Sequence, residues 1–255
     1  MQMLRLSLER KSIRIPDPLL PRRDRFRMEK VVLRALVFTA ACCSATKHVF
    51  VAERAPWSDA QKYCRAQYTD LSPLTNALEE EVFTDLMGRY KSGWVGLYWD
   101  SSDEPWSWSG GVTGLVRDFS AGLYWVGGRW FWRKARISSS FFCLDLVVVP
   151  EQKTWEEALY HCLGSGKNLT SLLSESESLL ARTQIQDSGV SGPVWTGMRY
   201  LEDRWMWVNG DPVQYEAWTG GQEDPCPLQR RCGALTPEGT WEDRDCGEKL
   251  SFVCA

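Results

Sequence analysis

Side chains that carry oxygen ligands gather at two places towards the end of the chain. Gln222, Glu223 and Asp224 form one group, and Glu242 and Asp243 form the other. Carboxylate and amide oxygens are the ligands that a hard cation such as calcium prefers in proteins. A cluster of acidic residues of this kind can hold calcium, and a solvated acidic surface is the alternative.

The composition gives little support to other chemistries. The chain of 255 residues contains two histidines, His48 and His161, which argues against a multi-histidine metal site and against a serine or cysteine triad. No nucleophile–base pair stands out, so we expect that the protein is not an enzyme. The formal net charge of -3 lacks the basic footprint that phosphate binding needs, so nucleic acid is not an expected partner.

The start of the chain has the pattern of a secretory signal peptide. Residues 1–27 are a basic extension, and Met28 is a second potential start. An apolar stretch follows at 31–45 and ends on the small residues Cys43 and Ala45, which predicts a signal peptide within the first 45 residues. A buried helix or an organellar transit segment is the alternative. No run reaches the roughly 18 apolar residues of a membrane span, so we expect a secreted, extracellular protein.

An internal repeat organises the rest of the chain. Trp57 precedes Cys64 by seven residues, and Trp155 precedes Cys162 by the same seven. Further matches follow in the same order: Trp94-Val95-Gly96-Leu97 with Trp195-Thr196-Gly197-Met198, Trp106-Ser107-Trp108 with Trp205-Met206-Trp207, and Trp130 before Cys143 with Trp241 before Cys254. The sequence therefore predicts two copies of one unit, at 46–143 and 144–255.

Each copy has the pattern of an α+β unit. β-branched residues at 49–51 and 146–149 predict opening strands. The expected helices are 58–68, 76–89, 155–163 and 174–185, with Ser58 and Thr154 suited to helix starts. Short tryptophan-rich strands follow in both copies. The charge differs between them, since 144–255 holds 18 acidic and 9 basic residues while 46–143 holds 11 of each.

Several of these motifs together resemble a C-type lectin-like domain. They are the helical cysteine after tryptophan, Trp195-Thr196-Gly197-Met198, Cys232-Gly233-Ala234-Leu235, and the ending Trp241…Cys246…Cys254. The resemblance covers residues 46–255, twice, and is strongest to the tandem domains of the macrophage mannose receptor family. It implies two domains, each with two helices and small antiparallel sheets stapled by disulfides.

The resemblance also implies how the cysteines pair. The outer pairs would be Cys64–Cys143 and Cys162–Cys254, and the inner pair of the second copy would be Cys232–Cys246. The first copy has Ala121 and Ala135 where an inner pair would stand, and it lacks the long loop. Cys226 is left over. It is either a free thiol or the link of a disulfide-bonded dimer.

By the same resemblance, Gln222, Asp224, Glu242 and Asp243 are the candidate sugar and calcium ligands of the second copy. Three departures count against calcium there: Glu223 replaces the family's proline, Glu242 replaces an amide, and Arg230 replaces an acidic residue. The first copy has Trp130-Phe131-Trp132 at this strand, without a carboxylate, so we expect a structural or partner-binding role for it.

Two functions follow as hypotheses. The first is carbohydrate recognition by the second copy, with calcium as a possible cofactor and glycans or glycoproteins as partners. The second is a calcium-independent module that binds protein ligands. Trp218 and Tyr215 lie near the candidate loop and would either stack on sugar or belong to the core. Asn168 begins a glycosylation sequon that is either used or left unmodified.

Overall fold

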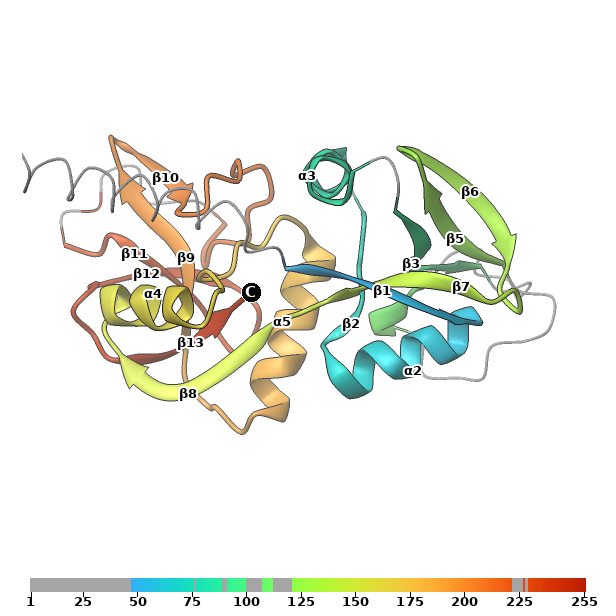
Figure 1. Cartoon of the computed structure of the whole chain (residues 1–255). Coiled ribbons are helices and arrows are strands. Elements are labelled where there is room, and N and C mark those ends of the chain that lie inside the picture. Colours follow the sequence, from blue (N-terminus) through green and yellow to red (C-terminus); the bar gives the residue numbers. More distant parts are fainter. Residues whose placement is uncertain are drawn as a thin grey trace, which may run out of the picture. The chain divides into compact units, whose positions relative to one another are not determined.

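The computed structural model describes residues 47–75, 77–88, 91–99, 107–111, 121–221, 227 and 229–255. The predicted signal segment lies outside them. Residues Cys42–Ala255 belong to one compact unit. Within it we call residues 47–144 the N-terminal half and residues 145–255 the C-terminal half, because the described strands form one sheet in each (Figure 1).

The N-terminal half contains a seven-stranded sheet in the order β1-β7-β3-β5-β6, with β2 on β7 and β4 on β3. Its elements are β1 His48–Ala55, α2 Trp57–Gln67, β2 Asp70–Leu71, α3 Ala77–Met87, β3 Ser92–Trp99, β4 Ser107–Trp108, a 3-10 turn η1 Ser109–Gly111, β5 Ala121–Val126, β6 Arg129–Lys134 and β7 Ser139–Leu144. Most pairings are antiparallel, and β3 pairs with β7 in parallel.

The C-terminal half contains a six-stranded sheet in the order β12-β11-β9-β13-β8, with β10 on β9. Its elements are β8 Val147–Lys153, α4 Trp155–Gly164, α5 Glu175–Asp187, β9 Val194–Leu201, β10 Arg204–Trp207, β11 Cys232–Leu235, β12 Trp241–Arg244 and β13 Leu250–Cys254. The two sheets share one plan: β9, β11 and β12 take the places of β3, β5 and β6. This mixed helix and sheet architecture agrees with the α+β prediction.

The helix starts differ between the halves. Thr154 caps α4 and completes a reciprocal pair of hydrogen bonds with Glu157, as its sequence position predicted. The expectation for Ser58 was wrong, because α2 begins one residue earlier, at Trp57, directly after Pro56. Trp57 is fully buried, so the packing of its indole against the sheet decides where the helix starts.

The indole N–H groups of the buried tryptophans that begin α2 and α4 find equivalent hydrogen-bond acceptors in the two halves. The indole N–H of Trp57 donates to the carbonyl of Val95 at 2.8 Å, and that of Trp155 donates to Thr196 at 2.9 Å. These bonds tie the first helix of each half to the central strand. Disulfides fasten the same helices to the sheet, through Cys64–Cys143 on β7 and Cys162–Cys254 on β13. Both are pairs that the resemblance implied.

Candidate functional site

Strand β12 carries the two predicted site residues that the structure describes, Glu242 and Asp243. Gln222, Asp224 and Cys226 lie outside the described residues. In the ladder with β11, Glu242 faces Ala234 and Asp243 faces Gly233. Since successive side chains on a strand point to opposite faces, Glu242 and Asp243 do not share a face of the sheet. The Cys232–Cys246 disulfide fastens β11 to the segment that follows β12.

Arg244 holds the carboxylate of Glu242. Its Nε and Nη2 lie 2.9 Å and 2.8 Å from Oε1 of Glu242, and its Nη1 lies 3.1 Å from Oε2 of Glu248. The guanidinium thus joins two carboxylates into one chain of ion pairs. A calcium ion bound to Glu242 would stand beside this positive charge, which is electrostatically unfavourable. The glutamate that the sequence offered as a ligand is therefore already neutralised.

The described residues near β12 do not form a metal cage. Among the parts of the chain that the structure describes, no group of three or more His, Cys, Asp or Glu side chains is arranged to hold a metal ion. Arg230, which stands at the family's acidic position, is exposed. Of the four predicted ligands, the structure describes two. Glu242 is a carboxylate that is already ion-paired, and Asp243 is a carboxylate on the opposite face of the strand.

The aromatic side chains near the candidate loop belong mainly to the core. Trp218 is buried, and its ring lies 4.8 Å from that of Trp205 and 5.7 Å from that of Trp241. It is not available to stack on a sugar. Tyr215 is half-buried with its ring 5.4 Å from Trp241. Of the two, only Tyr215 retains a surface that a ligand can reach.

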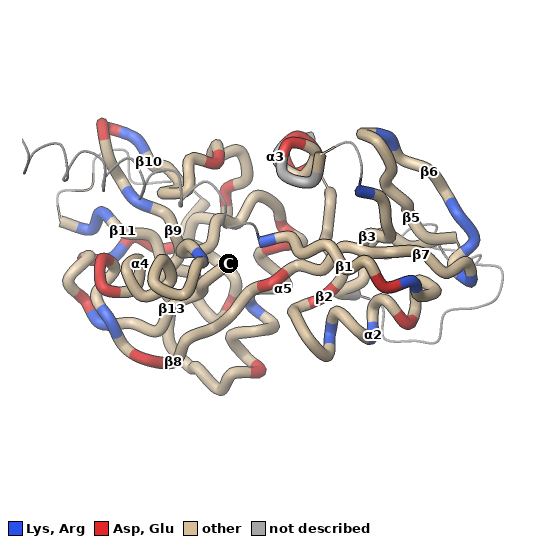
Figure 2. The backbone as a smooth tube through the Cα atoms, viewed as in Figure 1, with Lys and Arg blue, Asp and Glu red and all other residues tan. Residues whose placement is uncertain are grey.

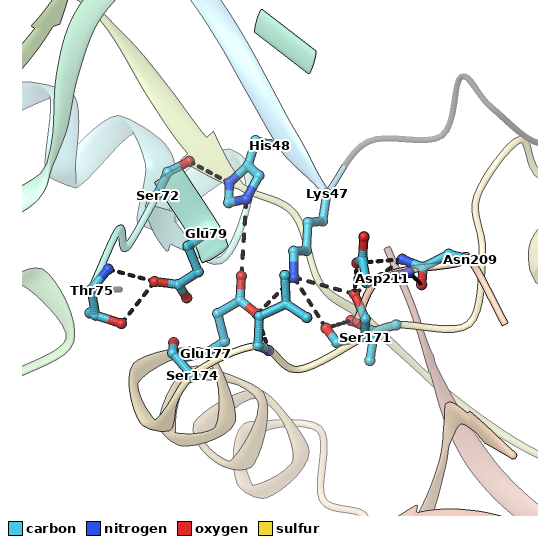
Figure 3. A network of polar contacts seen from close by, with 12 residues as sticks. Lys47, His48, Ser72, Thr75, Glu79, Ser171, Ser174, Glu177, Asn209 and Asp211 are labelled. Atoms are coloured by element: carbon cyan, nitrogen blue, oxygen red, sulfur yellow. Dashed lines mark hydrogen bonds and ion pairs between the residues drawn. The ribbon is translucent and has the colours of Figure 1, made fainter. Parts of the chain in front are cut away.

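A polar network that is buried around Lys47 and Glu177 joins the residue before β1 to the C-terminal half (Figure 3). Lys47 Nζ lies 2.7 Å from Oε2 of Glu177 and donates to the carbonyl and hydroxyl oxygens of Ser171 at 3.3 Å and 3.4 Å. Ser171 in turn donates to Asp211 at 2.5 Å, and Asn209 donates to Asp211 at 2.7 Å. One lysine thus connects α5 with the loop after β10.

The network contains a pair of equivalent glutamates. Glu79 in α3 and Glu177 in α5 are separated by 98 residues, and each is 1% exposed. Each accepts the backbone N–H of the residue four positions earlier: Thr75 donates to Glu79 at 2.5 Å, and Leu173 donates to Glu177 at 2.8 Å. The carboxylate fixes the turn before each helix, so this is a repeated structural device.

Burial controls the protonation of the groups at this junction. Desolvation raises the pKa of Glu177 to about 6, against the attraction of Lys47, and the nearby Glu79 raises it further. Desolvation, with a contribution from Lys47, lowers the pKa of His48 to about 3. His48 Nδ1 lies 3.0 Å from the Ser72 hydroxyl, and its Nε2 lies 4.0 Å from Glu177. At neutral pH the histidine is neutral and Lys47 pairs with a charged Glu177.

A cleft of about 820 Å³ lies beside this network. Thr75 and Ser174, both part of the polar network, contribute to its wall. The remaining wall comes from both halves of the chain and includes hydroxyl, charged and aromatic side chains: Ser107, Trp108, Ser109, Glu175, Ser176, Ser178, Arg182, Tyr215 and Glu238. The cleft was not anticipated from the sequence, because its walls are far apart along the chain.

Comparison with known proteins identifies the family to which this fold belongs. The family described as Lectin C-type domain matches residues 53–146 and 151–255, which together make up more than half of the chain. The chain belongs to the C-type lectin domain family. This match does not point to a catalytic family. No described helix has the length and apolar character to cross a membrane.

Relatives include the human (Homo sapiens) C-type mannose receptor 2, 28% identical over 128 residues that make up 49% of this chain and 8% of the receptor. The Mus musculus secretory phospholipase A2 receptor is 33% identical over 47% of this chain and 8% of the receptor. Dromaiocalcin-1 of Dromaius novaehollandiae is 33% identical over 39% of this chain and 74% of its own length. Each match covers about half of the chain or less, and the two receptors are covered over only a small part of their length.

Among solved structures, human lithostathine is 30% identical, with 43% of this chain and 80% of that chain covered and a TM-score of 0.39. A calcium-independent type II antifreeze protein is 26% identical over 43% of this chain and 82% of that chain, with a TM-score of 0.38.

Within this C-type lectin chain, the sequon at Asn168 lies in a buried segment. Asn168 is 8% exposed, and Thr170 is 1% exposed. The backbone of Asn168 exchanges two hydrogen bonds of 2.9 Å with Ala255. A glycan on this asparagine would have to leave through packed structure, so the geometry favours the unmodified alternative.

Sequence reasoning missed the network of Lys47, Glu177 and His48. The repeat contains a signal for the two glutamates, because Glu79 and Glu177 are 98 residues apart, the same spacing as Trp57 and Trp155 and as Cys64 and Cys162. Nothing in the local sequence links Lys47 to Glu177, which lies 130 positions away. That contact depends on how the two halves meet.

Proposed function

We propose that the chain is a secreted, calcium-independent binding module of two C-type lectin-like domains, residues 46–143 and 144–255, and that it recognises a protein ligand. The observation that carries this proposal is the ion pair between Arg244 and Glu242 on β12. The domain division is supported by the separate sheet in each half and by the two matched ranges. Secretion is supported by the predicted signal segment.

The ion pair argues against calcium in two ways. A calcium ligand must offer its oxygen to the metal, but Oε1 of Glu242 already accepts from two nitrogens of Arg244. Glu248 fixes the same guanidinium from the other side at 3.1 Å. Freeing Glu242 would thus break a chain of charge-assisted hydrogen bonds and would leave Arg244 next to the metal.

Arg244→Ala provides the test of this assignment. If the guanidinium is what excludes calcium, the variant gains a calcium response that the unchanged protein lacks. Lys249→Ala, which removes an exposed charge nearby in sequence, is the matched control. Calcium titration by calorimetry distinguishes the two. A calcium response in the unchanged protein would overturn the proposal.

Carbohydrate recognition by the C-terminal half is the second candidate function. The part of the cleft wall that this half contributes favours it, since Tyr215 offers a ring and Glu175, Glu238 and Arg182 offer hydrogen bonds that do not require a metal. Trp108 of the N-terminal half adds a second ring to the same wall. A glycan array read with calcium and with chelator tests it. Signal that chelator removes and that Asp243→Ala abolishes would assign the site to Gln222, Asp224, Glu242 and Asp243 instead.

Whether Cys226 forms a disulfide between two chains is a prediction about the oligomeric state. If it links two chains, the protein runs as a dimer on electrophoresis without reductant and as a monomer with it. A monomer in both conditions assigns Cys226 as a thiol that does not join chains.

A further inference from the structure

Strand β6 exposes large aromatic side chains. Phe131 and Trp132 are each 48% exposed, and Val126 at the end of β5 is 38% exposed. Large aromatic side chains in a folded domain are mostly buried, and those left at the surface are candidates for contact with a partner. The three residues lie in one β-hairpin, formed by β5 and β6.

The hairpin register places the two rings on opposite faces. Gly127 and Gly128 have φ of 58° and 76°, the left-handed values that a two-residue type I′ turn needs. Across the ladder, Phe131 faces Tyr124 and Trp132 faces Leu123. Because neighbours on a strand alternate, one exposed ring flanks each face of the same edge.

β6 is also the outer strand of its sheet. Among the described strands it pairs only with β5. In a hairpin closed by two residues, Val126 and Arg129 form the first hydrogen-bonded pair, so the backbone groups of Trp130 and Lys134 point away from β5. An edge of this kind can receive an extended segment of another chain.

The edge is positively charged. Arg129, Lys134 and Arg136 are exposed, and none of them forms an ion pair within the described residues. Figure 2 shows basic residues at both ends of β6. Arg133 lies 4.9 Å over the Tyr124 ring and donates to Ser139 at 2.9 Å, so its position is fixed. A partner that meets this edge has to bring negative charge.

We propose that the β6 edge binds an extended acidic segment of a protein partner. A segment that runs along the edge contacts both Phe131 and Trp132, whereas a flat membrane surface reaches only one face of the strand. Acidic side chains of the segment meet Arg129 and Lys134. This site lies in the N-terminal half and does not involve β12. A negative result for peptide binding at β6 therefore leaves the calcium-independent assignment of β12 untouched, and the reverse also holds.

The probe is a fluorescein-labelled peptide of about ten alternating glutamate and valine residues, a length that covers β6. We expect saturable binding to the full secreted protein that weakens as salt is raised. The double variant R129E/K134E should weaken binding by about tenfold or more, because it reverses two charges at the edge. Phe131→Ser should also weaken binding while leaving its salt dependence in place.

Matched controls separate this site from general effects. R54E/K249E reverses two exposed charges elsewhere, and Tyr160→Ser removes an exposed ring that is 68% exposed on α4. Neither should change binding by more than about twofold. Near-ultraviolet circular dichroism verifies that each variant is folded. The proposal is overturned if the peptide does not bind, if the controls weaken binding equally, or if vesicles of phosphatidylserine and phosphatidylcholine bind and the peptide does not.

Discussion

Strands β12 and β6 occupy the same place in two sheets of the same plan, and they carry opposite chemistry. β12 reads Trp241-Glu242-Asp243-Arg244, with Glu242 paired to Arg244 and the neighbouring strand β11 fastened by the Cys232–Cys246 disulfide. β6 reads Arg129-Trp130-Phe131-Trp132-Arg133-Lys134, with exposed rings and cations. The comparison shows that the scaffold tolerates a complete change of surface at this strand.

The positions that hold the scaffold together change much less. Trp57 and Trp155 make the same hydrogen bond to the central strand, and Glu79 and Glu177 fix the same turn before the second helix. These side chains are buried, so their shape and their partners constrain them in both halves. The difference between the halves is therefore concentrated at exposed strands and loops.

Removal of the outer disulfides should have the largest effect. C64A/C143A and C162A/C254A open links across 79 and 92 positions, and each should lower the free energy of unfolding by about 4–5 kcal/mol. The C-terminal half keeps Cys232–Cys246 in its variant, so it should retain more structure at a given urea concentration. Hydrogen exchange measured for each half gives the comparison. Earlier loss of the C-terminal half would show that the inner disulfide does not compensate.

Replacing the two buried glutamates, Glu79 and Glu177, should lower the free energy of unfolding by different amounts. Glu177→Ala leaves Lys47 buried without its ion-pair partner and should cost about 3–5 kcal/mol. Glu79→Ala removes hydrogen bonds to Thr75 and should cost about 1–3 kcal/mol. Urea unfolding of both variants measures the difference. If both variants lose the same free energy of unfolding, the ion pair between Lys47 and Glu177 does not stabilise the protein beyond the turn that both glutamates fix.

An inner disulfide introduced in the N-terminal half should stabilise it. Ala121 and Ala135 are separated by 14 positions, the separation of Cys232 and Cys246. The ladders differ by one position, because Ala121 faces Lys134 whereas Cys232 faces Arg244, two residues before Cys246. If the equivalence expected from the sequence holds in spite of this difference, A121C/A135C should form a disulfide and raise the free energy of unfolding by at most about 3 kcal/mol. Thiol titration and urea unfolding, with and without reductant, report on this. Two free thiols in the folded variant would contradict the equivalence of β5–β6 and β11–β12.

The stability of the protein around His48 and Glu177 should depend on pH in a graded way, with a smaller effect per pH unit than the changes above. The pKa of His48 falls from 6.5 to about 3 on folding, so its contribution to stability is complete above pH 6.5 and is lost as the pH falls towards 3. Glu177, with its pKa raised to about 6, acts in the opposite sense between about 4.5 and 6. The difference between unchanged protein and His48→Gln should fall by roughly 1 kcal/mol per pH unit below 6.5. A flat difference would mean that His48 titrates normally.

The sequence predicted those features that depend on local pattern or on the repeat. Helices α4 and α5 lie within two residues of their expected bounds, and Thr154 caps α4, because periodicity and capping act over a few positions. The prediction that the first helix starts at Ser58 was wrong, because the burial of Trp57 outweighed the local capping preference. The pairing of Glu242 with Arg244 depends on side-chain conformations that a sequence does not fix.

Calcium binding to the purified protein tests the central claim most directly. A site with a dissociation constant one hundredth of the added calcium would raise the free energy of unfolding by about 3 kcal/mol. Because Arg244 already neutralises Glu242, we expect the same thermal midpoint in calcium and in chelator, and no saturable heat on titration. A saturable rise of the midpoint with calcium that Asp243→Ala abolishes would contradict the account.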